Sequence, residues 1–180
     1  MPNQQPSITS VDGRQFAASS AAVLSFIVDP EGRVLMLAHP QHAGRWEPVN
    51  GALDAGETVL TAVQREVQEE AGPEIQVRPL GAFHVYTFRY DDNVQYMICI
   101  CYLLAYEGGP VVPGDDMAGS EAGWFHPAQI EGGEIEVIVP SVQTWLFRRA
   151  VDVYHLLKDQ PAVTLQPHFD ETTRHKYNRE

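Results

Sequence analysis

Three glutamates, Glu66, Glu69 and Glu70, follow one another closely in a stretch that could perform metal chemistry. The segment from Glu57 to Ala71 has no Gly or Pro and is rich in helix formers, so it predicts a helix that Gly72 ends. At about 100° per residue, Glu66 and Glu70 fall inside the apolar arc of this helix and Glu69 falls at its edge. The pattern therefore directs carboxylates toward the core.

Two carboxylates that face the core one turn apart repel each other and lose hydration. In one interpretation the end of the helix emerges at the surface and all three glutamates are hydrated. In the other, a divalent cation offsets both the repulsion and the lost hydration. Carboxylates are hard oxygen ligands, so such a site would select Mg²⁺, Mn²⁺ or Ca²⁺. The helix pattern alone leaves both interpretations open.

The residues before the helix extend the pattern. Gly51 and Gly56 are five apart and let a loop double back, and Glu57 opens the helix, where an acid suits the helix dipole. The full stretch, GALDAGETVLTAVQREVQEEAGP, has fixed spacings. In order it contains Gly51, five residues, Glu57, seven residues, Arg65-Glu66, an aliphatic residue, one residue, Glu69-Glu70, one residue and Gly72.

This stretch resembles the Nudix box, the signature of hydrolases that act on nucleoside diphosphates linked to another moiety. The only departure is Pro73, where the family usually has an aliphatic residue, and it affects only the exit from the helix. The resemblance implies an α/β fold, a Nudix-like α/β/α sandwich with a mixed β-sheet between helices. It also implies a pyrophosphohydrolase that needs Mg²⁺ (or Mn²⁺) and cleaves a phosphoanhydride bond in a phosphorylated small molecule.

The resemblance also assigns roles to residues of the box. Glu66, Glu69 and Glu70 would be metal ligands, or one of them the base that deprotonates the attacking water. Glu57 would ligate a metal directly or through water, or brace Arg65, which we expect to be an orienting ion-pair partner. The glycines would be scaffold residues: Gly51 lets the backbone approach the metal or phosphate, and Gly56 and Gly72 are structural.

A second acidic group lies in the loop before Trp124, where many Nudix enzymes supply an acid to the metal or to the water. Asp115, Asp116 and Glu121 are the candidates, and Glu121, three residues before Trp124, fits that placement best. The alternative is a solvated acidic loop. We therefore expect Glu66, Glu69 and Glu121 to be the catalytic carboxylates.

Two aromatic residues give indications of the substrate, and they favour different substrate classes. Trp46 lies before the box and either stacks on a base or anchors the core. Its lead-in, Trp46 to Gly51, resembles that of triphosphate-cleaving members, including dihydroneopterin triphosphate pyrophosphatases. Tyr90 lies near the position where members that cleave dinucleoside polyphosphates often have a tyrosine. The sequence thus leaves the leaving group open.

The elements that must position these residues follow from apolar runs and turn residues. We expect a hairpin of two strands, a loop with the box, the box helix, a run of strands and a late amphipathic helix. The expected strands are Ala21–Val28, Arg33–His39, Ile75–Val77, Ala82–Tyr90, Val94–Tyr106 and Trp124-Phe125, with loops at Pro40–Gly56 and Pro110–Gly123, a helical turn at Pro127–Ile130 and a helix at Pro140–Leu157.

Composition limits the partners. The 180 residues carry 12 Lys plus Arg against 24 Asp plus Glu, a net charge of −12, and show no basic patch for nucleic acid. No apolar run approaches the roughly 20 residues that span a bilayer, and the amino terminus does not read as a secretory signal. Cys99 and Cys101 form no disulfide framework. We therefore expect a cytoplasmic protein without nucleic-acid or membrane partners.

The chain divides into an N-terminal arm (1–20), a Nudix hydrolase domain (21–157) and a polar C-terminal tail (158–180). Apolar positions on the late helix would support a homodimer or pack against the sheet. The alternative to an enzyme is a Nudix domain that binds a nucleotide derivative as a regulator without turnover. The intact set of carboxylates favours the enzyme.

Overall fold

The structure is a computed structural model that describes residues 6–42, 44–138 and 143–162. A six-strand path in the order β10-β5-β4-β3-β8-β7 forms the main sheet, β6 pairs with β3 and β9 pairs with β4. The bounds are β1 (Ser7–Thr9), β2 (Gln15–Ala17), β3 (Ser20–Val28), β4 (Val34–Ala38), β5 (Arg45–Glu47), β6 (Val49–Ala52), α1 (Val59–Glu70), β7 (Gln76–Phe88), β8 (Met97–Gly108), η1 (Asp115–Met117), β9 (Ala122–Phe125), α2 (Pro127–Glu131), β10 (Glu136–Val137) and α3 (Trp145–Leu157).

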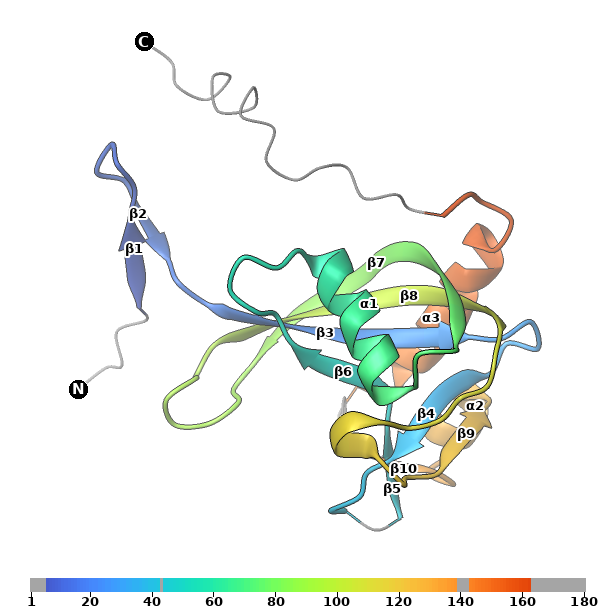
Figure 1. The fold of residues 1–180 in the computed structure, drawn as a ribbon. Coiled ribbons are helices and arrows are strands. Elements are labelled where there is room, and N and C mark those ends of the chain that lie inside the picture. Colours follow the sequence, from blue (N-terminus) through green and yellow to red (C-terminus); the bar gives the residue numbers. More distant parts are fainter. Residues whose placement is uncertain (1–5, 43, 139–142, 163–180) are drawn as a thin grey trace.

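Helices cover both faces of this sheet, with α1 on one face and α3 on the other (Figure 1). Val23 and Ile27 of β3 point into the core beneath α1, whereas Leu24 and Phe26 point into the core beneath α3. The alternation follows from the two-residue period of a strand buried on both faces. The predicted α/β sandwich with a mixed sheet is confirmed.

Strand β3 organises the site because it pairs with three strands. It runs parallel to β8 from Ser20↔Met97 to Val28↔Ala105, and its first half pairs with β6. Its end meets β4 at Val28↔Val34, where Asp29 accepts from the Arg33 backbone N–H and closes the predicted hairpin. Strands β6 and β4 therefore both run antiparallel to β3, β6 beside its first half and β4 beside its last residue.

Several predicted boundaries are wrong. The expected loop Pro40–Gly56 contains strands β5 and β6, which are short and separated by Pro48, so neither shows a strand pattern. The expected strands Ile75–Val77 and Ala82–Tyr90 are one strand, β7, whose register shifts around Pro79 and Gly81.

The late helix also differs from expectation. It begins at Trp145 rather than Pro140, and residues 140–142 lie outside the described residues. Leu146, Phe147, Ala150 and Tyr154 of α3 are buried against the sheet, which is one of the two roles expected for this face. The homodimer remains a prediction.

The predicted N-terminal arm contains a two-stranded hairpin, β1 with β2, that projects from the body of the molecule (Figure 1). Within residues 6–42, 44–138 and 143–162, no helix is long and apolar enough to cross a membrane.

Candidate active site

The box glutamates come together because α1 packs across β6. Thr58 caps the helix, and its side chain accepts from the backbone N–H of Thr61 at 3.2 Å. Leu60, Ala62, Val63, Glu66, Val67 and Glu70 form the buried face of the helix, as the helical wheel predicts. Two carboxylates are thus buried in the core-facing side of α1.

Glu66 contacts the strand that carries Gly51. A Cβ atom added at Gly51 would overlap the carboxylate of Glu66, so only glycine lets strand and side chain approach this closely. Burial is the largest cause that raises the pKa of Glu66, and the neighbouring Arg65 opposes it.

Glu70 is the most strongly perturbed carboxylate of the site. It is 6% exposed and accepts from the backbone N–H of Asn50 at 2.9 Å. Burial raises its pKa to about 8, and the nearby charges of Glu66, Asp116 and Glu47 add to the shift. A buried carboxylate with three acidic neighbours calls for a counter-charge.

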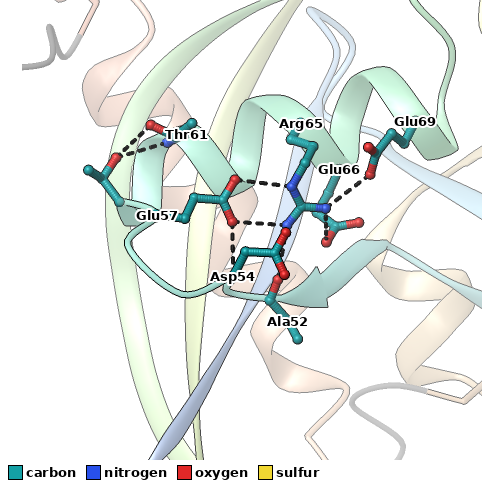
Figure 2. A network of polar contacts seen from close by, with 8 residues as sticks. Ala52, Asp54, Glu57, Thr61, Arg65, Glu66 and Glu69 are labelled. Carbon is teal, nitrogen blue, oxygen red and sulfur yellow. Dashed lines mark hydrogen bonds and ion pairs between the residues drawn. The ribbon is translucent and has the colours of Figure 1, made fainter.

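Arg65 supplies one positive charge (Figure 2). Its guanidinium donates to Glu57 at 3.0 Å through both Nε and Nη2, and to the carbonyl of Ala52 through Nη2. Its Nη1 donates to Glu66 at 2.8 Å and to Glu69 at 3.0 Å. The hydrogen bonds from Arg65 lower the pKa of Glu57. In turn, the hydrogen bonds to Glu57, Glu69 and Glu66 raise the pKa of Arg65.

The loop before β9 docks on the C-terminal end of α1. Gly114 N–H donates to the carbonyl of Glu70 at 3.1 Å, and Val112 N–H donates to that of Ala71 at 2.9 Å. Gly72 has φ +104°, and a side chain there would meet the carbonyl of Val112. These contacts fix η1, which follows Gly114, against the acidic end of the helix.

A cavity of about 650 Å³ opens beside Glu70 and η1. Its walls come from α1, β3, β5, β6, the β4–β5 loop, the β7–β8 hairpin and η1. The lining residues are Ser20, Ala21, Ala22, His39, Pro40, Gln41, Glu47, Asn50, Gly51, Ala52, Leu53, Glu70, Phe88, Tyr90, Val94, Met97, Asp116 and Met117.

Among the loop acids, the structure brings Asp116 to the cavity and not Glu121. Asp116 lines the cavity and acts electrostatically on Glu66 and Glu70. Glu121 is exposed and contributes its backbone carbonyl to Ala38. Spacing to Trp124 favoured Glu121, whereas the docking of η1 on α1 brings Asp116 closer.

Glu47 is a site residue that the sequence analysis did not single out. It is 7% exposed, lines the cavity and lies 3.7 Å from His39 Nε2. Burial is the largest cause that raises its pKa. A signal was present, because Glu47 is a single acid between Trp46 and Pro48 in an otherwise uncharged lead-in. Because this segment was expected to be a loop, the sequence did not predict that the Glu47 side chain is buried.

The two predicted aromatic contacts lie in different places. Tyr90 lines the cavity together with Phe88 and is 69% exposed. Trp46 packs edge-on against Phe125, with ring centroids 4.8 Å apart, and belongs to the core beneath α3. The structure therefore gives Trp46 the anchoring position and leaves Tyr90 at the cavity.

The donor set fits a divalent cation. Glu66, Glu69, Glu70, Glu47 and Asp116 offer hard oxygen atoms, and three of these carboxylates, Glu47, Glu66 and Glu70, are buried. Within the described parts of the chain, no three acids, histidines or cysteines already converge on one point. Arg65 Nη1 lies between Glu66 and Glu69 instead.

The NUDIX domain family model matches residues 18–146, more than half of the chain. The chain belongs to the NUDIX family. Among curated relatives, the NAD-capped RNA hydrolase NudC of Photobacterium profundum is 33% identical over 104 residues, which cover 57% of this chain and 36% of that protein. The chain thus spans between 33% and 43% of the length of the NudC relatives it matches.

Solved NUDIX structures share the fold. The MutT protein from Methanosarcina mazei Go1 superposes with a TM-score of 0.58 at 23% identity, covering 76% of this chain and 95% of that one. The E. coli dihydroneopterin triphosphate pyrophosphohydrolase gives a TM-score of 0.54 at 19% identity and covers 76% of this chain and 94% of that one. At these identities the likeness shows the fold alone.

Proposed function

We propose that this NUDIX protein is a divalent-cation-dependent hydrolase that cleaves a phosphoanhydride bond in a nucleoside diphosphate linked to another moiety. The carrying observation is the buried carboxylate of Glu70 at the wall of a cavity large enough for a nucleotide, with the buried carboxylate of Glu66 against Gly51 of the same wall. Phosphate oxygens are repelled by such a wall unless a cation stands between them. Mg²⁺ or Mn²⁺ suits this set of oxygen ligands.

Glu66, Glu69 and Glu70 would hold the cation, with Asp116 and Glu47 close by. When bound, the cation supplies charge neutralisation at the phosphate oxygens and lowers the pKa of a water. A carboxylate of this set takes the proton from the attacking water. Arg65 orients the carboxylates, and Glu57 braces Arg65 rather than ligating the cation, since both of its oxygens accept from the guanidinium.

The cavity has both acidic and aromatic lining residues. Glu47, Glu70 and Asp116 line the part of the wall that would receive the phosphates through the cation, and the rings of Phe88 and Tyr90, which line the same cavity, would offer a stacking surface for an aromatic group. NudC relatives are named as NAD-capped RNA hydrolases, so NAD and NAD-capped RNA belong among the candidate substrates despite the net charge of −12. The absence of nucleic-acid partners therefore stays a prediction, and NAD-capped RNA in the substrate panel below tests it.

The test is hydrolysis of a substrate panel with Mg²⁺ or Mn²⁺, followed by identification of the phosphate products. The panel contains nucleoside triphosphates, nucleotide sugars, ADP-ribose, dinucleoside polyphosphates, NAD, NAD-capped RNA and dihydroneopterin triphosphate. Glu69→Gln should lower kcat/KM by about 100-fold or more, because the cation loses a ligand worth several kcal/mol. Glu74→Gln, an exposed acid just past the box, should leave turnover unchanged.

The loop acids give a matched pair within the same assay. Asp116→Asn should lower turnover strongly, whereas Glu121→Gln, the same kind of change in the same loop, should have little effect. The opposite order would restore Glu121 as the catalytic acid. Turnover with all divalent cations chelated would contradict the proposed function, and tight nucleotide binding without hydrolysis would support the regulatory alternative.

A further inference from the structure

The guanidinium of Arg65 uses all five of its N–H donors. Nε and one Nη2 hydrogen bind the two oxygens of Glu57, and the second Nη2 hydrogen binds the carbonyl of Ala52. The two Nη1 hydrogens bind Glu66 and Glu69. An arginine has five donors and no more, so every position of the fork is occupied.

These donors divide into an anchoring edge and an acidic edge. On the anchoring edge, Glu57 is itself held, because its Oε2 also accepts from the backbone N–H of Asp54 at 3.1 Å. On the acidic edge, Nη1 bridges two carboxylates that the proposed function assigns to the cation (Figure 2). The Glu69 side chain is half exposed to solvent, whereas the Glu57 side chain is packed.

We propose that Arg65 is an internal cation that holds Glu66 and Glu69 in the metal-free protein and yields them to the divalent cation. The inference rests on the proposed function, since it concerns the same carboxylates. On loading, Nη1 gives up its two acceptors while Nε and Nη2 keep Glu57 and Ala52. Arg65 is thus a positioning residue whose anchor, Glu57, determines how readily it releases the ligands.

The electrostatic reason is a competition for the same oxygens. The positive charge of Arg65 lies within 3 Å of both carboxylates and repels an incoming dication. Glu66 and Glu69 must therefore release Arg65 before they coordinate the dication. Without Arg65, the dication meets unpaired carboxylates. Without Glu57, the guanidinium loses its bidentate partner and its remaining charge partners are the ligands themselves, so they hold it more firmly.

The test is a titration of the full chain with Mn²⁺, in which the electron paramagnetic resonance signal of free Mn²⁺ measures how much is bound. Arg65→Gln should bind Mn²⁺ at least about fivefold more tightly than the unaltered chain, a change of the size of one partly screened ion pair. Glu57→Gln should bind it more weakly. The double variant should bind as tightly as Arg65→Gln alone, because the effect of Glu57 acts through Arg65.

Other outcomes separate the alternatives. If Glu57 is a metal ligand, the double variant binds more weakly than Arg65→Gln, which overturns the inference. Equal or weaker Mn²⁺ binding by Arg65→Gln also overturns it, while the proposed function stands. If the unaltered chain binds no Mn²⁺, the proposed function fails and this inference fails with it.

Two further readouts do not depend on affinity. In the presence of a chelator, Arg65→Gln should melt at a lower temperature than the unaltered chain. Without chelator, added Mn²⁺ should raise the melting temperature of Arg65→Gln by more than it raises that of the unaltered chain. In the unaltered chain, Mg²⁺ should speed exchange of the Arg65 Nη hydrogens with water in ¹⁵N spectra, because Nη1 loses both acceptors. Unchanged guanidinium signals on Mg²⁺ saturation would contradict the release of Nη1 even if the variant does not fold.

Discussion

Glu70 gives the site a dependence of stability on pH. Burial raises its pKa from an ordinary 4.5 to about 8, so in the metal-free protein the folded chain keeps a proton that the unfolded chain loses. The sign follows directly: its contribution is fully favourable below pH 4.5 and is lost as the pH rises toward 8. The slope approaches about 1.4 kcal/mol per pH unit for one proton.

Glu70→Gln should remove this part of the pH dependence. In chelator, the free energy of unfolding of the unaltered chain should fall between these two pH values relative to that of the variant, as measured by urea denaturation. Mg²⁺ should flatten the difference in the unaltered chain, because the cation stabilises the ionised carboxylate. The exposed Glu74→Gln is the control. Parallel curves for the unaltered chain and Glu70→Gln would show that Glu70 ionises freely in the fold.

At the same scale, the sequence predicted the part of the site that lies in one continuous stretch. The helical wheel placed Glu66 and Glu70 in the apolar arc of α1 but left their burial open, and the structure shows that both are buried. Glu47 and Asp116 reach the same cavity from β5 and from η1, and their positions depend on strand pairing and on the docking of the loop. No local pattern encodes those contacts.

At the scale of the element, Thr58 determines where α1 starts. The sequence placed the start at Glu57, but Thr58 adopts the extended conformation of an N-cap and the helix begins at Val59. Thr58→Ala should destabilise the fold by about 1 kcal/mol, because the Thr61 N–H loses its acceptor. Thr58→Ser keeps the hydroxyl and should restore most of that loss in denaturant unfolding. Equal loss in both variants would show that the methyl group, and not the cap, matters.

Long, apolar strands were predictable and short ones were not. The run of apolar residues from Ala21 to Val28 lies within β3, buried on both faces, and such a strand shows itself by composition. Strands β5, β6 and β10 have two to four residues and exist because neighbours offer them hydrogen bonds. A strand of that length has no period to detect.

At the scale of the whole molecule, the α/β fold class was predicted from the resemblance, because strands that alternate with two substantial helices are typical of both α/β and α+β domains. The pairings were not predicted, because β3 lies beside β8, a strand far along the chain, in parallel register. The resemblance of one helix and its loop to the Nudix box supplied what periodicity lacked. A local motif thus predicted an architecture that its own residues do not determine.

The limits of the folded domain can be tested at both ends. At the C-terminal end, Arg78 of β7 donates to the carbonyls of Lys158 and Gln160, at 2.6 Å each, and so ties the segment after α3 to the sheet. The predicted domain end at Leu157 would remove both acceptors. A chain ending at Leu157 should therefore be about 1–3 kcal/mol less stable than one ending at Ala162, since a partly buried guanidinium is left with Glu107 alone.

At the N-terminal end the expected result is the opposite. The principal contacts of β1 and β2 are with each other, and the NUDIX match begins at residue 18. Removing residues 1–17 should change the melting temperature by less than about 2 °C, because little surface shared with the body is lost. The melting temperatures of the three truncated chains, measured in the same buffer, provide the comparison. A large loss on removing the hairpin, or equal stability of the chains ending at Leu157 and Ala162, would move the domain boundary at that end.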